Sequence, residues 1–220
     1  MPVSDHAFSA AERAAVYRAI AERRDMRHFA PNQSIGAEQL ARLLNAAHQA
    51  PSVGLMQPWR FIRITDPSLR ARIADLVESE RQLTAEALGP RKAEFLQLKV
   101  EGIRDCAELL VVALADQREQ HIFGRRTLPQ MDLASAACAI QNLWLAARAE
   151  GLGLGWVSLF DPQALGELLN IPAGGEAIAI LCLGPVEAFY AKPMLVEQGW
   201  REPQPLSALL AENHWPEAAE

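Results

Sequence analysis

The chain has little cysteine and no long apolar run. Its 220 residues include three cysteines, which are far apart and form no Cys-x-x-Cys pair: Cys106, Cys138 and Cys182. This spacing gives no disulfide framework, so we expect three packed thiols in apolar surroundings. No stretch reaches the ~18 apolar residues of a membrane span. Residues 1–5 lack the basic and apolar regions of a signal peptide. We therefore expect a cytoplasmic protein that does not enter membranes.

Several catalytic signatures are also missing. No Gly-x-Gly-x-x-Gly follows an expected strand, and there is no Walker A lysine motif. The histidines have no metal-ligand spacing, and the cysteines do not join them, so we expect no metal. Ser158 lies outside any Gly-x-Ser-x-Gly elbow, which disfavours a serine hydrolase. The glycines of residues 151–155 lead into a strand, where we expect a helix C-cap and a close approach of backbone to ligand.

Positive charge is in deficit, because 21 Lys and Arg face 27 Asp and Glu, for a net charge of −6. This balance disfavours nonspecific binding of nucleic acid. The hydrophobic share of 50% is that of a globular protein, and the length suffices for one core. Without repeats or linkers, we expect a single domain over residues 1–220, whose residues from about 187 onward form an extended arm.

Periodicity and breaker residues predict an α+β fold with a small mixed β-sheet flanked by helices. The first helix begins at a capping box of Ser9 and Glu12, and the fourth follows Gly89 and Pro90. We expect helices ending near residues 24, 50, 87, 105, 150 and 169, and strands over residues 60–65, 109–115, 154–159 and 177–183. The helix over residues 131–150 is apolar on all sides, which predicts extensive burial, with burial between subunits as an alternative. The polar loop 116–129 is long enough for a lid or a binding loop.

The segment 51–59, which we call the ring loop, is the first stretch that points to a ligand. Its two prolines exclude a helix, and Gly54 permits a turn that is closed to other residues. The loop therefore presents Ser52 and Gln57 beside Met56 and Trp59. Edge hydrogen-bonding groups next to apolar faces suit a flat, heteroatom-rich ring. The alternative is an ordinary helix-to-strand connection with a buried Trp.

A second stretch, residues 23–27, follows the first helix and carries Arg23, Arg24 and Arg27 around Asp25 and Met26. We call it the arginine motif. Guanidinium groups make planar, bidentate bonds to phosphate. Alternatively, arginines at a helix end simply complement the helix dipole.

Together the two stretches resemble the nitroreductase-like FMN proteins. Asp25 in place of Ser, together with Val53 and Leu55 in the ring loop, resembles one branch of that superfamily, the 5,6-dimethylbenzimidazole synthases. The resemblance runs from about residue 12 to about residue 203. It continues through residues 98–104, 129–133, 141–151, 155–158, 181–184 and 199–201.

The resemblance implies a nitroreductase-like fold and a homodimer with FMN sites at its interface. It also implies that reduced FMN is a substrate, which O2 fragments to 5,6-dimethylbenzimidazole, the lower ligand of cobalamin, and a four-carbon sugar phosphate. A separate flavin reductase would supply the reduced FMN. The flavin carries the oxygen chemistry, and the protein supplies position and proton transfer.

Carried over by resemblance, Asp25 and Ser158 are the candidate catalytic residues. A carboxylate near the ring is a sensible acid or base, and pairing with Arg24 or Arg27 would orient it and lower its pKa. For Ser158 the alternative is a buried serine bonded to backbone. The expected FMN-binding residues are Arg23, Arg24, Asp25, Met26, Arg27, Ser52, Met56, Gln57, Trp59, Gly155, Trp156 and Ser158. His28 and the loop 116–129 have no assigned role.

Two other functions remain open. One is an NAD(P)H-dependent FMN nitroreductase, against which Asp25 and the altered ring loop argue. The other is a non-enzymatic protein that stores or delivers FMN.

Overall fold

A computed structural model describes residues 6–215, which form two compact units, one ending at Phe189 and the other beginning at Tyr190. Residues 1–5, whose sequence led us to expect no signal peptide, lie outside the described part. So do residues 216–220 of the expected arm. The single domain over residues 1–220 stays a prediction.

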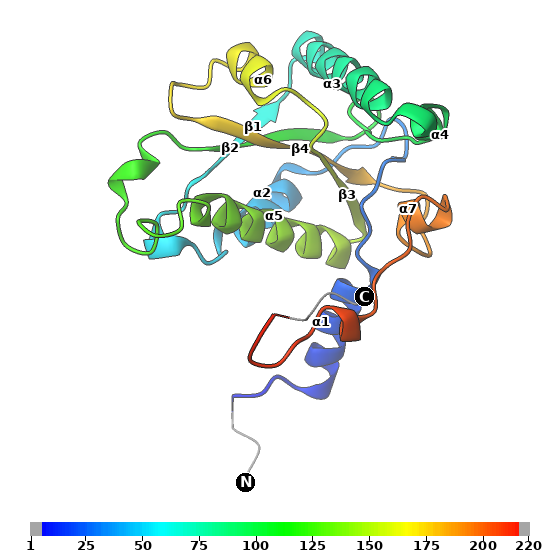
Figure 1. Cartoon of the computed structure of the whole chain (residues 1–220). Coiled ribbons are helices and arrows are strands. Elements are labelled where there is room, and N and C mark those ends of the chain that lie inside the picture. Colours follow the sequence, from blue (N-terminus) through cyan, green and yellow to red (C-terminus); the bar gives the residue numbers. More distant parts are fainter. Residues whose placement is uncertain (1–5, 216–220) are drawn as a thin grey trace. The chain divides into compact units, whose positions relative to one another are not determined.

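The larger unit is built on a four-stranded sheet in the order β1-β2-β4-β3 (Figure 1). Its strands are β1 (Trp59–Ile64), β2 (Glu108–Leu114), β3 (Leu152–Val157) and β4 (Glu176–Pro185). All three pairings of these strands are antiparallel. The expected mixed sheet was therefore wrong, because the four strands pair only antiparallel. Among the described residues, a parallel pairing occurs as an isolated bridge between Asp25 and Leu154, outside the four strands. The start of β1, the end of β2 and the start of β4 meet at one end of the sheet, because Trp59 pairs with Leu114 and Leu114 with Glu176.

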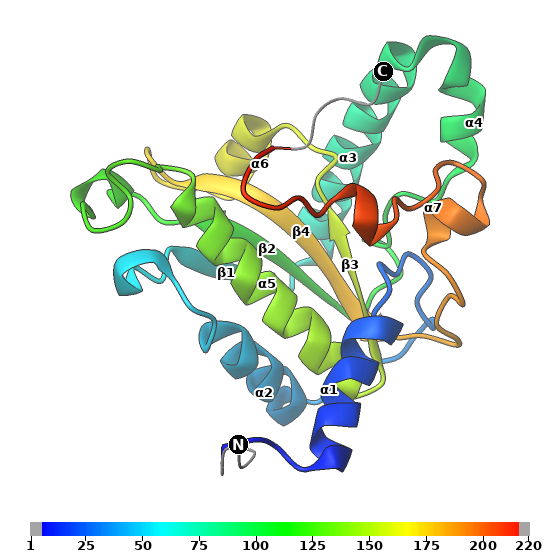
Figure 2. The same ribbon diagram turned by 60° about the horizontal axis from the view of Figure 1, so that its bottom comes forward.

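Helices cover both faces of the sheet (Figures 1 and 2). On one face lie α2 (Ala37–His48) and α5 (Met131–Ala149), and on the other lie α3 (Pro67–Ala87), α4 (Lys92–Gln97) and α6 (Pro162–Leu168). The N-terminal helix α1 (Ala10–Glu22) begins at the expected capping box and contacts α5. Most of the predicted elements are thus confirmed to within a few residues at each end.

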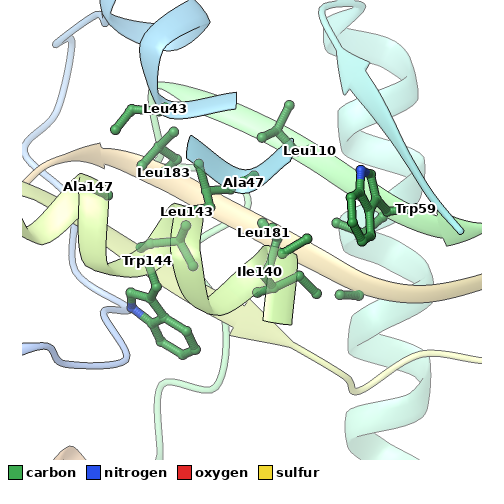
Figure 3. Packing of buried hydrophobic residues seen from close by; sticks show 14 of the residues in the cluster. Leu43, Ala47, Trp59, Leu110, Ile140, Leu143, Trp144, Ala147, Leu181 and Leu183 are labelled. Carbon is green, nitrogen blue, oxygen red and sulfur yellow. The ribbon is translucent and has the colours of Figure 1, made fainter. Parts of the chain in front are cut away.

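The main core lies between the sheet and the α2–α5 pair (Figure 3). Alternate strand residues point to opposite faces of a sheet, so Leu110, Val112 and Leu114 of β2 join this core. They meet Leu43 of α2 and Leu143 of α5. Because the other face of the sheet is covered as well, every residue of β2 is buried.

Two sequence predictions were wrong. The fourth helix ends at Gln97 rather than near Asp105, since Leu98 takes an extended conformation. The backbone at Gly102 then passes so close to Phe29 that an added Cβ would lie 2.5 Å from its ring. The cysteines are also not all packed: Cys106 and Cys182 are buried, but Cys138 lies on the exposed side of α5.

The smaller unit contains α7 (Met194–Glu197) and a 3₁₀ turn over Leu206–Ala208. The Trp200 backbone N–H donates to the Leu195 carbonyl, which ties the residues after α7 to that helix. Among residues 6–215, no helix combines the length and the apolar character that crossing a membrane requires.

Candidate functional site

The arginine motif lies along the free edge of β3. The Met26 N–H donates to the Leu154 carbonyl at 3.0 Å, and Asp25 forms the parallel bridge to the same residue. Gly155 makes this approach possible, because a Cβ there would lie 2.1 Å from the Met26 carbonyl oxygen. The close approach expected of this glycine is thus to the chain's own backbone, and it fixes Asp25 against the strand.

Asp25 is held by two partners on opposite sides of its carboxylate. Its Oδ2 accepts a hydrogen bond from Arg27 Nη2 at 2.6 Å, and its Oδ1 accepts from the Trp156 N–H at 2.9 Å. Arg27 Nη2 also donates to the Trp156 carbonyl at 2.8 Å. The Arg27 side chain is only 10% exposed, whereas 43% of the Asp25 side chain remains accessible. Asp25 is therefore oriented by the chain and still open to a ligand.

The pairing with Arg27 was expected to lower the pKa of Asp25, but the net shift is upward. Burial raises the pKa of this carboxyl, and it outweighs the opposing effects of Arg27, the Trp156 N–H and Arg23. A raised pKa brings an aspartate closer to the range in which it exchanges protons near neutral pH.

Arg23 and Arg24 are organised by α5. Trp144 Nε1 donates to the Arg24 carbonyl at 3.1 Å, and the Arg23 guanidinium lies 4.6 Å from the centre of the Trp144 ring. The Arg24 Nη1 donates to the Ala21 and Arg23 carbonyls at 2.8 Å each, at the C-terminal end of α1. Arg24 therefore has the helix-end role that was the alternative to phosphate binding. Arg23 lies near enough to Asp25 to oppose the rise in the pKa of that carboxyl.

The ring loop is rigid in the way its sequence predicts. Gly54 has φ +52°, and Gln57 also lies in the left-handed region with φ +48°. Ser52 Oγ accepts from the Gln57 N–H at 3.0 Å, which closes the loop. Trp59 is buried, and its Nε1 donates to His48 Nδ1 at 3.3 Å. Met56 is half-buried. The loop thus presents a fixed backbone, and the buried Trp59 also fits the alternative of a structural connection.

Ser158 follows β3 and is exposed, so the alternative of a buried serine is wrong. It lines a cavity of about 480 Å³ at the end of the sheet, together with Leu114, Phe160 and Ile178 and with arginines of the loop 116–129. An exposed hydroxyl in a concave site is available to a ligand.

Apart from Ser158 in the cavity at the end of the sheet, the predicted residues form two groups in one chain. The arginine motif, Gly155 and Trp156 come together near Trp144, toward the C-terminal end of α5. The ring loop is attached near the other end, where its Val53 N–H donates to Ser135 Oγ at 3.0 Å. Nine residues of helix separate these two anchors, which is about 13 Å at 1.5 Å per residue. Trp144 and Ser135 were not predicted as site residues, because both lie in a stretch that the sequence marks as apolar helix.

Comparison with known proteins places the chain in a family. The model of the nitroreductase family matches residues 20–185, and the chain belongs to that family. Within it, the chain is 41% identical to a 5,6-dimethylbenzimidazole synthase of Rhodospirillum rubrum over 186 residues, which are 83% of this chain and 87% of the relative. It is 39% identical to a protein of the same description from Rhodobacter capsulatus, over 90% of this chain and 96% of the relative.

Solved structures agree on the fold. Nitroreductase A of Vibrio parahaemolyticus superposes with a TM-score of 0.68 at 23% identity, covering 93% of this chain and 78% of that protein. An iodotyrosine deiodinase bound to FMN and 3-iodo-L-tyrosine gives a TM-score of 0.70 at 22% identity, covering 91% and 100%. The expected nitroreductase-like α+β fold is therefore confirmed.

Proposed function

We propose that this chain is a 5,6-dimethylbenzimidazole synthase, which uses O2 to fragment reduced FMN into 5,6-dimethylbenzimidazole and a four-carbon sugar phosphate. The observation that carries the assignment is the identity of about 40% to two such synthases over most of both chains. The product is the lower ligand of cobalamin, so the enzyme acts in cobalamin biosynthesis.

The residues of the arginine motif fit FMN. Arg23 and Arg24 form a local cationic site on a protein of net charge −6, which suits one phosphate group. Arg27 is largely used in holding Asp25 and Trp156, so its part in binding FMN is indirect. Trp156 and Met56, both half-buried, offer apolar surface to the flavin ring. When bound, the flavin supplies the reaction with oxygen.

Asp25 is the acid or base of the reaction in this proposal. Its carboxylate is fixed from two sides, is partly accessible, and has a raised pKa, which are the properties that proton transfer requires. Ser158, which directly follows β3 and lies three residues beyond Gly155, contributes a hydroxyl. Ser52 and Gln57 of the ring loop line the ring site, with Met56 and Trp59 near it.

The active enzyme is a homodimer in this proposal, with each FMN site completed by the partner's ring loop. Helix α1 has no buried residue in the single chain and exposes Val16, Tyr17 and Ile20. Helix α5 exposes Leu133 and Cys138 on its outer side. Apolar helix faces of this kind are covered by partners in stable proteins. A dimer also explains why the two site groups lie apart along α5, because each FMN site then combines one group from each subunit.

Each turnover destroys a flavin, so reduced FMN must be delivered anew, and we assign that delivery to a separate flavin reductase. The cytoplasm expected from the sequence stays a prediction, with which three free thiols are compatible.

The decisive experiment is chromatography of the products after aerobic incubation with reduced FMN. A synthase yields 5,6-dimethylbenzimidazole. A flavin carrier yields only FMN and hydrogen peroxide. A conventional nitroreductase instead oxidises NAD(P)H rapidly in the presence of a nitroaromatic compound.

A further inference from the structure

The first turns of α5 carry two of the four buried polar or charged residues among residues 6–215, Asp132 and Ser135. Neither was predicted as a site residue from the sequence. Buried polar groups are kept where they have partners, so their partners indicate what they do. Both bind loops that border the candidate site.

Asp132 binds two arginines of the loop 116–129. Its Oδ2 accepts from Arg118 Nε at 2.8 Å and from Arg125 Nε and Nη2 at 3.2 Å each. Its Oδ1 accepts from the Leu133 N–H at 2.7 Å. The Asp132 side chain is 6% exposed, and the arginine side chains are 14% and 19% exposed. One carboxylate therefore holds two cations from opposite ends of the loop in a largely dry setting, where charge-assisted hydrogen bonds are strong.

Arg118 extends this connection to the sheet. Its Nη1 donates to the Gly174 carbonyl at 2.7 Å and to the Ala115 carbonyl, and its Nη2 lies 3.7 Å from Glu176 Oε2. These residues follow β2 and precede or begin β4. The result is a wall of the cavity that Ser158 lines, since Arg118, Arg125 and Asp132 all border it.

Ser135 holds the ring loop from the same part of the helix. Its hydroxyl accepts from the Val53 N–H at 3.0 Å and donates to the Met131 carbonyl at 2.5 Å. The two loops also pack against each other at their tips. A Cβ at Gly54 would lie 2.9 Å from the Phe123 carbonyl oxygen, and a Cβ at Gly124 would lie 2.5 Å from Val53 Cγ2.

We infer that Asp132 and Ser135 are positioning residues, which hold the loop 116–129 and the ring loop in the arrangement that the reaction of reduced FMN requires. The inference rests on the proposed function for the identity of the reaction. It assigns a role to the loop 116–129, namely a wall of the site fixed through Arg118 and Arg125. Loss of either anchor lets its loop move, so that oxygen consumes the reduced flavin without productive fragmentation.

The test compares Asp132→Asn with Glu108→Gln. Glu108 is a matched control, because it is also a buried carboxylate paired with an arginine. Its two oxygens accept hydrogen bonds from Arg63, each at 2.7 Å. Unlike Asp132, it is not among the residues that line the cavity. The measured quantity is benzimidazole formed per reduced FMN oxidised, together with hydrogen peroxide. We expect Asp132→Asn to lower this yield about 10- to 100-fold, the effect of a small misplacement of reacting groups, while peroxide rises. Glu108→Gln should leave the yield within about twofold even if it lowers the melting temperature.

A second readout uses no flavin. Trypsin cleaves after arginine, and the loop contains Arg118, Arg125 and Arg126. Asp132→Asn should speed limited cleavage in this loop severalfold in the folded protein, and Glu108→Gln should not. Equal yields and equal cleavage rates in the two variants would overturn the inference. If the wild type forms no benzimidazole, the proposed function fails, and the cleavage rates alone decide on the positioning role.

A milder pair covers the case in which Asp132→Asn does not fold. Ser135→Ala removes the acceptor for the ring loop, and Ser79→Ala is its control, because Ser79 Oγ makes the same bond to a carbonyl four residues earlier, Asp75, at 2.9 Å. Both substitutions favour the helix itself. Ser135→Ala should lower the yield of benzimidazole at least about threefold, by the same loss of loop position, and Ser79→Ala should not change it. An unchanged yield in Ser135→Ala removes the role of Ser135.

Discussion

The carboxylate of Asp25 is clamped between the guanidinium of Arg27, at 2.6 Å, and the backbone N–H of Trp156, at 2.9 Å. Asp25 and Arg27 lie two residues apart in the chain. Trp156 of β3, about 130 residues downstream, holds both side chains, because Arg27 also donates to the Trp156 carbonyl. This arrangement sets the orientation of the acid and leaves part of its side chain accessible.

Replacing Asp25 by Asn keeps the shape and some hydrogen bonding but removes the ionisable group. Benzimidazole formation should fall by ~10²–10⁴-fold, the usual contribution of a positioned proton-transfer group. Affinity for FMN should change little, because Arg23 and Arg24 remain. Oxygen can still oxidise the reduced flavin, so the variant should produce FMN and peroxide. Loss of binding together with activity would mean that Asp25 mainly orders the arginines, and an undiminished yield would make it a bystander.

The same variant has a distinctive dependence of stability on pH. Because the pKa of Asp25 is raised in the folded state, by burial above all, its favourable contribution is present below the unfolded pKa of about 4 and is lost as pH rises through the folded pKa. The asparagine does not titrate. The melting temperature of Asp25→Asn should therefore gain on that of the wild type as pH rises above about 4.

Asp132→Asn should show the opposite trend. Burial alone would raise the pKa of Asp132, but Arg118, the Leu133 N–H and Arg125 together hold it below its usual range. The stability that this carboxylate contributes is present at neutral pH and is lost as pH falls through its folded pKa. The deficit of Asp132→Asn should shrink in acid, and thermal melts of both variants at matched pH values check the two signs together.

FMN should bind more tightly than riboflavin, because the phosphate accepts charge-assisted hydrogen bonds from the arginine motif. Arg23→Gln combined with Arg24→Gln should weaken FMN binding about 10- to 100-fold, the equivalent of one or two such bonds, and leave riboflavin affinity unchanged. Arg104→Gln is the control, since Arg104 pairs with Asp75 at 2.7 Å, away from the motif. Equal affinities for the two flavins in a titration at fixed ionic strength would sink the assignment.

Gly155→Ala should separate the arginine motif from β3. Its Cβ would meet the backbone oxygen of Met26 at 2.1 Å, and backbone cannot swing aside as a flexible side chain can. We expect a loss of about 3 kcal/mol in unfolding free energy, the upper end of the usual range for overpacking, together with weakened FMN binding. Gly36→Ala serves as the control, because nothing lies within 4 Å of its added Cβ. Denaturant titration of both variants measures the difference.

The proposed homodimer predicts a twofold mass in light scattering at micromolar concentration. Val16 and Ile20 lie one turn apart on the exposed face of α1. Ile20→Glu should dissociate the dimer and reduce FMN binding, because a charge cannot be buried there without a partner. Leu83→Glu, at a residue of α3 that is 64% exposed, should do neither. A monomeric wild type with full activity contradicts the proposal.

Most of the element boundaries could be predicted because they depend on local signals. Ser9 and Glu12 start α1, Pro67 starts α3, and Gly151 follows α5 with φ +77°. Strand order and direction could not, since they depend on which edges meet in space. After the early end of α4, the chain passes close to Phe29 at Gly102, and this approach joins residues 73 apart in sequence, which no local pattern reveals.

The candidate site, too, could be predicted from the sequence only in part. The arginine motif and the ring loop were visible as residue types that suit phosphate and a flat ring. Three features required the packed structure: the Trp156 N–H as a second partner of Asp25, the roles of Trp144 and Ser135, and the upward shift of the Asp25 pKa. Charged partners can be guessed from sequence, but the extent of burial that competes with them cannot.

Helix α5 sets the spacing between the two parts of the site. Asp132 and Ser135 hold loops at one end of the helix, and Trp144 holds the arginine motif at the other. A helix advances by 100° per residue, so one inserted or deleted residue between Ser135 and Trp144 would turn one set of anchors away from its partners. Changes of chain length in this protein should therefore be confined to its loops, and α5 should tolerate substitutions on its outer face but no change in the number of its residues.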